Sequence, residues 1–293
     1  MLKRLPFLCA ALLALAACSH DSDTGSAAQQ AAPAATSSAE AAPASTTASS
    51  SAPATAGSAA PAATGTVAAA AATTTPAAPA PAAVPFVDNG KWVEGKNYFL
   101  IDPAQPTSHP GKIEVTEVFS YGCPACNGFH STADQIAKSL PPNAVMNYLA
   151  ASFRPDENWP MYQRAFYAAQ ALNLVDKTHD AMFDAVWKSG ELSTYNLKAS
   201  GLKPHSAWPT IEDAAKFYAK YGVDPKEFVG VANSFTVNTK MKRADDLMKA
   251  YGVDSTPTMI VNGKYRFTAS SAGGYAQSIE LTQWLVAKEA AGK

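Results

Sequence analysis

The segment from Ser19 to Pro85 sets the strongest limit on what this chain can fold into. It consists mainly of Ala, Pro, Ser and Thr, has no aromatic residue, and carries only three charged side chains, Asp21, Asp23 and Glu40. Such a segment cannot bury enough apolar surface to offset the conformational entropy lost on ordering. We therefore expect residues 18–85 to form a disordered linker and residues 86–293, about 208 in number, to form one folded domain.

The first twenty residues, MLKRLPFLCAALLALAACSH, have the pattern of an export signal. Lys3 and Arg4 precede an apolar run that is too short to span a bilayer. The run ends in Leu15-Ala16-Ala17-Cys18, which resembles the lipobox of bacterial lipoproteins. The resemblance implies that residues 1–17 are removed, that Cys18 is lipidated, and that the protein is anchored in the periplasm to the inner or outer membrane. The alternative is an ordinary signal peptide that happens to contain a cysteine.

The composition narrows the classes of partner. The 23 Lys and Arg residues nearly balance 24 Asp and Glu, and they form no basic stripe, so nucleic acid is not an expected partner. No long apolar run follows the signal, so we expect no second membrane segment. Of the four cysteines, Cys9 lies in the signal and Cys18 at the lipidation position, which leaves Cys123 and Cys126 for the folded domain. Disulfides persist in the oxidising compartment that exported proteins enter.

Hydrophobic periodicity predicts an α/β domain. The segment KIEVTEVFS, 112–120, alternates as a strand does and places Glu117 on the same face as Val115 and Phe119. Asn262-Gly263, between two apolar runs, predicts a hairpin with a type I′ turn. The predicted order is a strand at 112–120, a helix ending at Pro141-Pro142, a strand at 145–153, a helical insertion at about 155–235, a helix at 237–251, the hairpin at 258–268 and a helix at 275–290. Without the insertion this is a βαβ unit followed by a ββα unit.

Cys123 and Cys126 lie at the junction between the first predicted strand and the helix that follows it. Cys123 occupies the cap position and Pro124 the first helical position, so free N–H groups and the helix dipole point at the Cys123 sulfur. This environment favours the thiolate, which is the nucleophilic form of cysteine. Cys126, one turn into the helix, is placed to attack a mixed disulfide formed on Cys123. A purely structural cross-link is disfavoured, because closing so small a loop adds little stability.

Two further positions have a chemical interpretation and a simpler alternative. A buried Glu117 would have a raised pKa and could exchange a proton with Cys126; in the alternative, its carboxylate reaches water at the edge of the sheet. Thr256-Pro257 stands between a helix and the hairpin, where proline can adopt the cis form in a tight turn. The alternative there is an ordinary loop proline.

Metal binding by the cysteine pair is a competing interpretation. Cys123, Cys126 and His130 have the spacing C-x2-C-x3-H. Structural zinc sites generally use four ligands, and the sequence has no second cysteine pair and no other histidine at ligand spacing. Haem attachment would require histidine at position 127, where the chain has Asn127. We therefore expect no metal and no other cofactor, the cysteine pair itself being the redox centre.

Two stretches of the chain resemble DsbA-type thiol:disulfide oxidoreductases of the thioredoxin superfamily, here in lipoprotein form. They are EVFSYGCPACNGFH at 117–130 and GVDSTPTMIVNGKY at 252–265, and the helical insertion matches in place and size. The resemblance implies a thioredoxin fold with Cys123 as the exposed nucleophile and Cys126 as its resolving partner. It further implies that Glu117 is the family's buried acid, and that Pro257 is a cis-proline beside the cysteines that presents the Thr256 backbone to a substrate strand.

The same resemblance implies a reaction and its partners. The Cys123–Cys126 disulfide would be donated to reduced, unfolded exported proteins, and a DsbB-like membrane oxidase would re-oxidise the pair. We expect a monomer, because the N-terminal extension is a linker and not a dimerisation domain. One departure stands out: strong oxidants of the family have Pro-His between the cysteines, whereas this chain has Pro124-Ala125, which predicts a milder oxidant. The alternatives are a disulfide reductase or isomerase, or a metal-binding or scaffolding lipoprotein.

Overall fold

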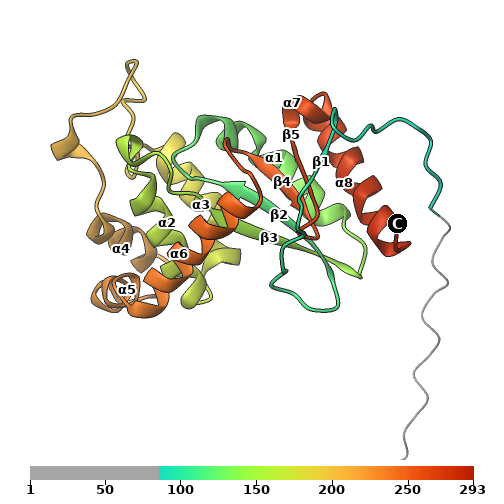
Figure 1. Cartoon of the computed structure of the whole chain (residues 1–293). Coiled ribbons are helices and arrows are strands. Elements are labelled where there is room, and N and C mark those ends of the chain that lie inside the picture. Colours follow the sequence, from blue (N-terminus) through green and yellow to red (C-terminus); the bar gives the residue numbers. More distant parts are fainter. Residues whose placement is uncertain (1–85) are drawn as a thin grey trace, which may run out of the picture. The chain divides into compact units, whose positions relative to one another are not determined.

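The computed structural model describes residues 86–293, which form a mixed five-stranded sheet flanked by helices (Figure 1). The strands lie in the order β1-β5-β4-β2-β3. Parallel pairing joins β2 to β3, and the other three pairs are antiparallel. Their bounds are β1 Phe99–Leu100, β2 Ile113–Phe119, β3 Ala144–Ala150, β4 Thr258–Val261 and β5 Tyr265–Thr268.

Both faces of the sheet are buried. Met259 and Val261 of β4 belong to an apolar cluster shared with helices α1 (Pro124–Ser139) and α8 (Tyr275–Ala290). Ile260, between them, belongs to a second cluster formed with the helices that follow β3. Because helices cover both faces, every residue of β2 from Glu114 to Phe119 is buried. The predicted alternation along this strand therefore does not separate a buried face from an exposed one.

A helical segment follows β3, as predicted. It contains α2 (Trp159–Ala171), α3 (Val175–Trp187), α4 (Ile211–Ala219) and α5 (Pro225–Ala232), with short 3-10 turns at Pro155–Glu157 and His205–Ala207. The long helix α6 (Phe235–Ala250) then leads back to β4. The helices gather at the left of Figure 1. A capping box of Thr210 and Asp213 begins α4.

Residues 188–210 differ from the helical pattern expected across this segment. Apart from the 3-10 turn, they form a non-helical connection that stands away from the helices at the upper left of Figure 1. Gly190 and Gly201 adopt positive φ of 75° and 96°, a conformation that does not fit a right-handed helix. Pro204 and Pro209 lack the backbone N–H that continuing a helix needs.

The predicted hairpin is confirmed. Asn262 and Gly263 both have positive φ, 52° and 66°, and the N–H of Lys264 donates to the carbonyl of Val261 at 3.0 Å, as a type I′ turn requires. The backbone of Gln105 approaches so closely that a Cβ at Gly263 would lie 2.1 Å from its carbonyl oxygen. Glycine is thus required here by both conformation and space. A short helix, α7 (Ala269–Ala272), links the hairpin to α8.

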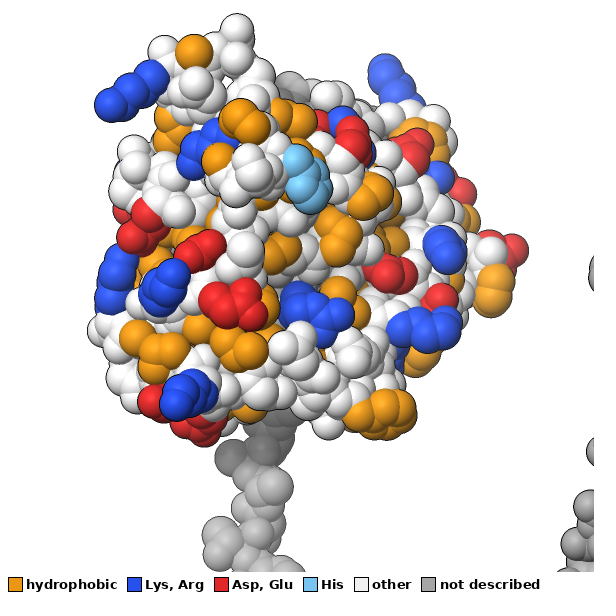
Figure 2. All heavy atoms as spheres, turned by 90° about the vertical axis from the view of Figure 1, so that its left-hand side faces the viewer, with side chains coloured by type: hydrophobic (Ala, Val, Ile, Leu, Met, Phe, Trp, Pro, Cys, Tyr) orange, Lys and Arg blue, Asp and Glu red, His pale blue; other side chains and the backbone are white. Residues whose placement is uncertain are grey.

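Charged side chains of both signs are interspersed on the face shown in Figure 2, which is the left-hand side of Figure 1. Two ion pairs lie at and near α4: Lys216 is 2.9 Å from Asp213, and Lys220, just after the helix, is 2.8 Å from Glu191. Exposed pairs of this kind contribute little to stability. Among the described residues, no helix is both long enough and apolar enough to cross a membrane. The predicted signal, Cys18 and the linker lie outside the described residues.

Candidate active site

Cys123 caps the N-terminus of α1, as the sequence predicts. Its backbone is extended (φ −91°, ψ 117°), and its sulfur accepts a hydrogen bond from the N–H of Cys126 at 3.3 Å. Pro124 occupies the first turn, where its missing N–H is not needed. Strand β2 ends at Phe119, just before the loop that leads to Cys123. The sheet therefore fixes the Cys123 sulfur at the N-terminus of α1, which is the positive end of the helix dipole.

The two thiols, both free, have opposite electrostatic environments. A hydrogen bond from the Cys126 thiol, with further bonds from the backbone N–H groups of Cys126 and Ala125, lowers the pKa of Cys123 to about 6 against the opposing effect of desolvation. Complete burial raises the pKa of Cys126 well above its ordinary value, and the bond to Cys123 adds to the effect. Pro124 and Ala125, between them, are exposed. Only the Cys123 sulfur is therefore a thiolate near neutral pH.

Glu117 is buried in the centre of β2 with 1% of its surface exposed. Neither of its carboxylate oxygens has a hydrogen-bond partner among the described residues. Desolvation, followed by the charges of Cys123 and Asp134, raises the pKa of Glu117 to about 8. The alternative that its carboxylate reaches water at a sheet edge is wrong, because β3 and β4 flank β2 on both sides.

The Thr256–Pro257 peptide bond is cis, and it lies beside the cysteine pair. The Thr256 carbonyl oxygen is 3.5 Å from the Cys123 sulfur. Strand pairing explains this closeness, because β4 begins at Thr258, which lies opposite Val118 of β2. Val118 is close to the end of β2, after which residues 120–123, the cysteine loop, lead into α1. Within residues 86–293, the N–H and C=O of Thr256 form no hydrogen bond with another backbone group.

The helical segment closes over the cysteine loop, which sequence patterns did not predict. A Cβ added at Gly122 would lie 2.8 Å from the Tyr162 ring and 3.1 Å from Trp159, so these α2 side chains press on the residue before Cys123. The Trp187 indole of α3 donates to the Tyr121 carbonyl at 2.8 Å. No spacing in the sequence indicates these contacts, because they join segments about 40 to 65 residues apart.

His130 does not join the cysteines in a ligand group. Its Nε2 lies 3.0 Å from Asp180 of α3, and its ring packs against Phe183. Among the described residues, the group of at least three metal-ligating side chains that come together is His130, Asp134 and Asp180. The spacing C-x2-C-x3-H therefore does not produce a shared site.

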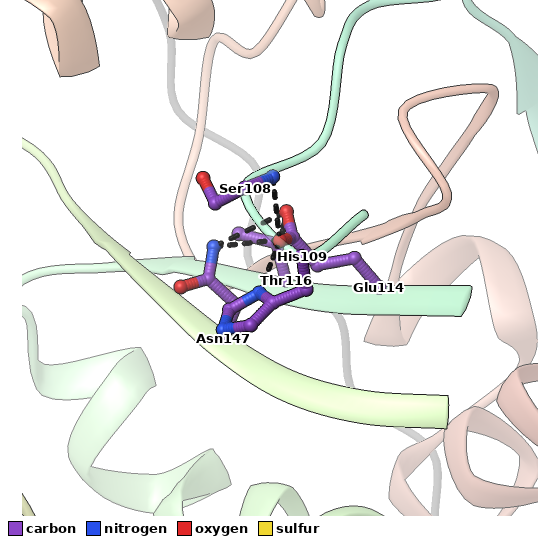
Figure 3. A network of polar contacts seen from close by, with 5 residues as sticks. All are labelled: Ser108, His109, Glu114, Thr116 and Asn147. Carbon is purple, nitrogen blue, oxygen red and sulfur yellow. Dashed lines mark hydrogen bonds and ion pairs between the residues drawn. The ribbon is translucent and has the colours of Figure 1, made fainter. Parts of the chain in front are cut away.

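A cavity of about 450 Å³ lies away from the cysteines, between β3 and helices α2 and α6. Ser108, His109 and Asn147 line it and also bind the buried carboxylate of Glu114 (Figure 3). Glu114 accepts from the Ser108 N–H at 2.9 Å, His109 Nδ1 at 2.6 Å, the Thr116 hydroxyl at 3.2 Å and the Asn147 amide at 3.3 Å. Glu114 and Glu117 thus lie three residues apart on one strand, the first with four partners and the second with none.

The fold and the cysteine pair together are those of the thioredoxin class of redox proteins, and the family model described as Thioredoxin matches residues 110–280. The thiol:disulfide interchange protein DsbA of Pseudomonas aeruginosa is 35% identical over 200 residues, covering 68% of this chain and 87% of that protein. DsbA of Azotobacter vinelandii is 33% identical over 195 residues, covering 67% and 83%. This chain belongs to the DsbA family of thiol:disulfide oxidoreductases.

Solved structures agree with this assignment. The crystal structure of Pseudomonas aeruginosa DsbA matches with a TM-score of 0.59 and 34% identity, covering 70% of this chain and 97% of that one. DsbA from Xylella fastidiosa also matches with a TM-score of 0.59, at 29% identity, covering 68% and 98%. The predicted α/β thioredoxin fold with a helical insertion is confirmed.

The contrast between the two glutamates predicts opposite effects of the same substitution. The raised pKa of Glu117 means that its contribution to stability is fully present below about pH 4.5 and is lost as the pH rises through about 8. At pH 7 Glu117 is ionised in the unfolded chain and must take up a proton on folding, and Glu117→Gln removes this cost. The substitution should therefore raise the free energy of unfolding by about 2 to 3 kcal/mol at pH 7, with a smaller gain at pH 5. Urea unfolding of the dithiol protein measures this difference.

Glu114→Gln is the matched control. It removes a carboxylate that accepts four hydrogen bonds, so it should lower the free energy of unfolding by about 1 to 3 kcal/mol at both pH values. If Glu117→Gln destabilised the protein at pH 7 as Glu114→Gln does, Glu117 would not be the unpaired acid described above.

Proposed function

We propose that the Cys123–Cys126 disulfide oxidises reduced, unfolded proteins exported to the periplasm, with Cys123 as the sulfur that substrates attack. A substrate thiolate would attack Cys123, break the Cys123–Cys126 bond and form a mixed disulfide. A second substrate thiolate would then attack the substrate sulfur and release Cys123. The substrate loses two electrons and two protons. The cysteine pair gains the two electrons and one of the protons, on Cys126, and the other proton passes to solvent because Cys123 is released as a thiolate. The cap position of Cys123, with its pKa of about 6, is the observation that carries this proposal.

The stabilised thiolate supplies the driving force for the reaction. A sulfur whose pKa is about 6 leaves a mixed disulfide more readily than the sulfur of an ordinary cysteine. The same hydrogen bonds stabilise the reduced pair relative to the disulfide, which raises the reduction potential. The geometry of the α1 N-terminus therefore favours transfer of the disulfide to a substrate over retention of the oxidised pair.

We assign Glu117 the role of proton donor to Cys126. When substrate attack releases Cys126, its thiolate is buried and strongly disfavoured there. Glu117, also buried and with a pKa of about 8, is protonated at neutral pH. Its charge, when it is ionised, contributes to the raised pKa of Cys126, so the two groups interact electrostatically. Proton transfer leaves Cys126 as a thiol, Cys123 in its mixed disulfide and Glu117 as a carboxylate. The transfer is favoured because the pKa of Cys126 is raised further than that of Glu117, and Glu117 then regains a proton from solvent.

Thr256 and Pro257 form the proposed substrate-binding edge. Among residues 86–293, the N–H and C=O of Thr256 form no backbone–backbone hydrogen bond, so they can bond to an extended substrate backbone. The carbonyl oxygen lies 3.5 Å from the Cys123 sulfur that would be attacked. Recognition through main-chain groups suits unfolded substrates, because every protein chain offers the same donors and acceptors. Exposed Pro124 and Ala125 border the same sulfur.

A complete cycle requires partners outside this chain. A DsbB-like membrane oxidase would accept the two electrons from the reduced pair. We also propose a monomer tethered to a bacterial membrane through lipidated Cys18, the linker allowing the domain to reach substrates away from the bilayer. The support for the tether is the sequence from Lys3 to Cys18.

Substitutions of the cysteines separate the two proposed roles. Cys123→Ser should abolish oxidation of a reduced, unfolded test protein, because no sulfur remains at the helix cap. Cys126→Ser should trap a mixed disulfide between Cys123 and the test protein that is visible on a non-reducing gel. In the dithiol protein, Cys123 should react with iodoacetamide at half its maximal rate near pH 6, while Cys126 stays unreactive. A trapped complex formed by Cys123→Ser instead would reverse the assignment.

The residue between the cysteines should set the strength of the oxidant. Ala125→His adds a donor and a possible positive charge near the Cys123 thiolate, and should raise the reduction potential by about 30 mV or more in glutathione equilibration. Ser131→His, at an exposed position further along α1, is the control and should leave the potential unchanged. A wild-type potential near that of thioredoxin, about −270 mV, would contradict the oxidase and favour a reductase.

If Cys18 is lipidated, substituting it should change the location of the protein in the cell. Wild-type protein expressed in a Gram-negative host should incorporate a fatty-acid label and sediment with membranes. Cys18→Ser should incorporate no label and appear in the soluble periplasmic fraction, since the acceptor sulfur is gone. Cys9→Ser is the matched control, because Cys9 lies within the predicted signal. Labelling that survives in Cys18→Ser would rule out the proposed anchor.

A further inference from the structure

Three metal-ligating side chains meet where α1 packs near α3. His130 and Asp134 lie four residues apart on α1, so they occupy the same helical face, and Asp180 extends from α3. One ligand atom from each residue lies within 4.8 Å of the corresponding atoms of the other two. His130 Nε2 and Asp180 Oδ1 are already 3.0 Å apart.

This spacing fits a small divalent ion. Zn²⁺ binds imidazole nitrogen and carboxylate oxygen at about 2.0 to 2.2 Å, so two ligand atoms of one ion lie at most about 4.4 Å apart. The His130–Asp180 pair, at 3.0 Å, is within that limit, all three ligand atoms lie within 4.8 Å of one another, and the Asp180 side chain, 77% exposed, is free to rotate inward. An imidazole ligand favours Zn²⁺ and neighbouring transition metals over Mg²⁺ and Ca²⁺, which prefer oxygen alone.

A second observation concerns the nitrogen of His130 that faces away from Asp180. The His130 side chain is only 16% exposed, and its Nδ1 is buried with no hydrogen-bond partner. The ring of His179 packs edge-on at 5.3 Å, and its Nε2 is also buried without a partner. His179 Nδ1 is engaged with the Tyr121 hydroxyl at 2.9 Å. Among the described residues, the half-buried imidazole of His130 and the buried imidazole of His179 thus each have a buried ring nitrogen without a hydrogen-bond partner.

Metal binding would give these two nitrogens complementary roles. A metal on His130 Nε2 places the remaining ring proton on Nδ1, which makes that atom a donor. His179, when its Nδ1 donates to Tyr121, presents Nε2 as an acceptor. Histidine ligands in metal sites almost always donate their second N–H to an acceptor, which holds the ring in place. His130 Nδ1 and His179 Nε2 form no hydrogen bond among the described residues, so a shift of the two rings would be needed to join them.

We propose that His130, Asp134 and Asp180 bind one divalent transition-metal ion such as Zn²⁺, with water completing the coordination. The site is separate from the cysteine pair, although His130 lies one helical turn beyond Cys126. Because α1 carries the cysteines and α3 belongs to the helical segment, the ion would cross-link the catalytic helix to the helices that close over it. The inference does not depend on the direction of disulfide transfer.

The test is Zn²⁺ titration of the full-length protein by calorimetry, with Cys123 and Cys126 joined as a disulfide so that thiols do not bind the metal. We expect one equivalent to bind at the described site and the thermal unfolding midpoint to rise. Asp180→Asn, an exposed and mild substitution, and His130→Ala should each weaken binding at least about tenfold. His205→Ala, at an exposed histidine on the 188–210 connection, is the control and should bind as wild type does.

A second control removes a possible site in the linker. His20 lies beside Asp21 and Asp23, so His20→Ala is measured alongside the other variants. Binding lost in His20→Ala but kept in Asp180→Asn and His130→Ala would overturn the proposal. So would the absence of Zn²⁺ binding to the oxidised protein, or Mg²⁺ binding as tightly as Zn²⁺.

Discussion

The hydrogen bond from the Cys126 N–H to the Cys123 sulfur is the interaction on which the chemistry of this protein depends. It completes the first turn of α1, and in doing so it uses a sulfur where most helices use an oxygen. The same contact that begins the helix therefore also stabilises a thiolate. A change that moved the start of α1 by one residue would remove this cap and part of the stabilisation of the Cys123 thiolate, to which the Cys126 thiol and the Ala125 N–H also contribute. Folding and redox chemistry are thus linked through the first turn of α1.

The central strand supports this arrangement at a cost to stability. Strand β2 holds two buried glutamates, and only Glu114 has its hydrogen bonds satisfied. Burial disfavours the charged form of Glu117, and the charges of Cys123 and Asp134 add to this effect, so Glu117 keeps a proton at neutral pH. A hydrogen-bonded carboxylate at that position would be better for the fold but would not hold the proton that the proposed transfer to Cys126 requires.

The helical segment restrains the loop before Cys123 as well as covering it. Tyr162 and Trp159 press on Gly122, and Trp187 holds the Tyr121 carbonyl, so the loop before Cys123 is restrained from the side opposite the sheet. His179 of α3 bonds to Tyr121, and Asp180 of α3 bonds to His130. These two contacts connect the helical segment to residues on both sides of the cysteine pair. The proposed metal ion would strengthen the same connection. The position of the nucleophile is therefore set by the strand, the capped helix and the helical segment together.

Local patterns in the sequence determined much of this protein. Pro124 after Cys123 predicted the capped helix, and Asn262-Gly263 predicted the turn, because each rests on contacts between residues close in the chain. The order of strands and helices predicted a βαβ unit followed by a ββα unit, and the family resemblance implied the thioredoxin fold. Only the tertiary structure decided the burial of Glu117, which depends on which strands and helices flank β2. It likewise decided that Thr256 lies beside Cys123 and that His130 turns to α3 and not to the cysteines. Those outcomes join residues about 30 to 140 positions apart, and hydrophobic periodicity carries no information about which distant surfaces meet.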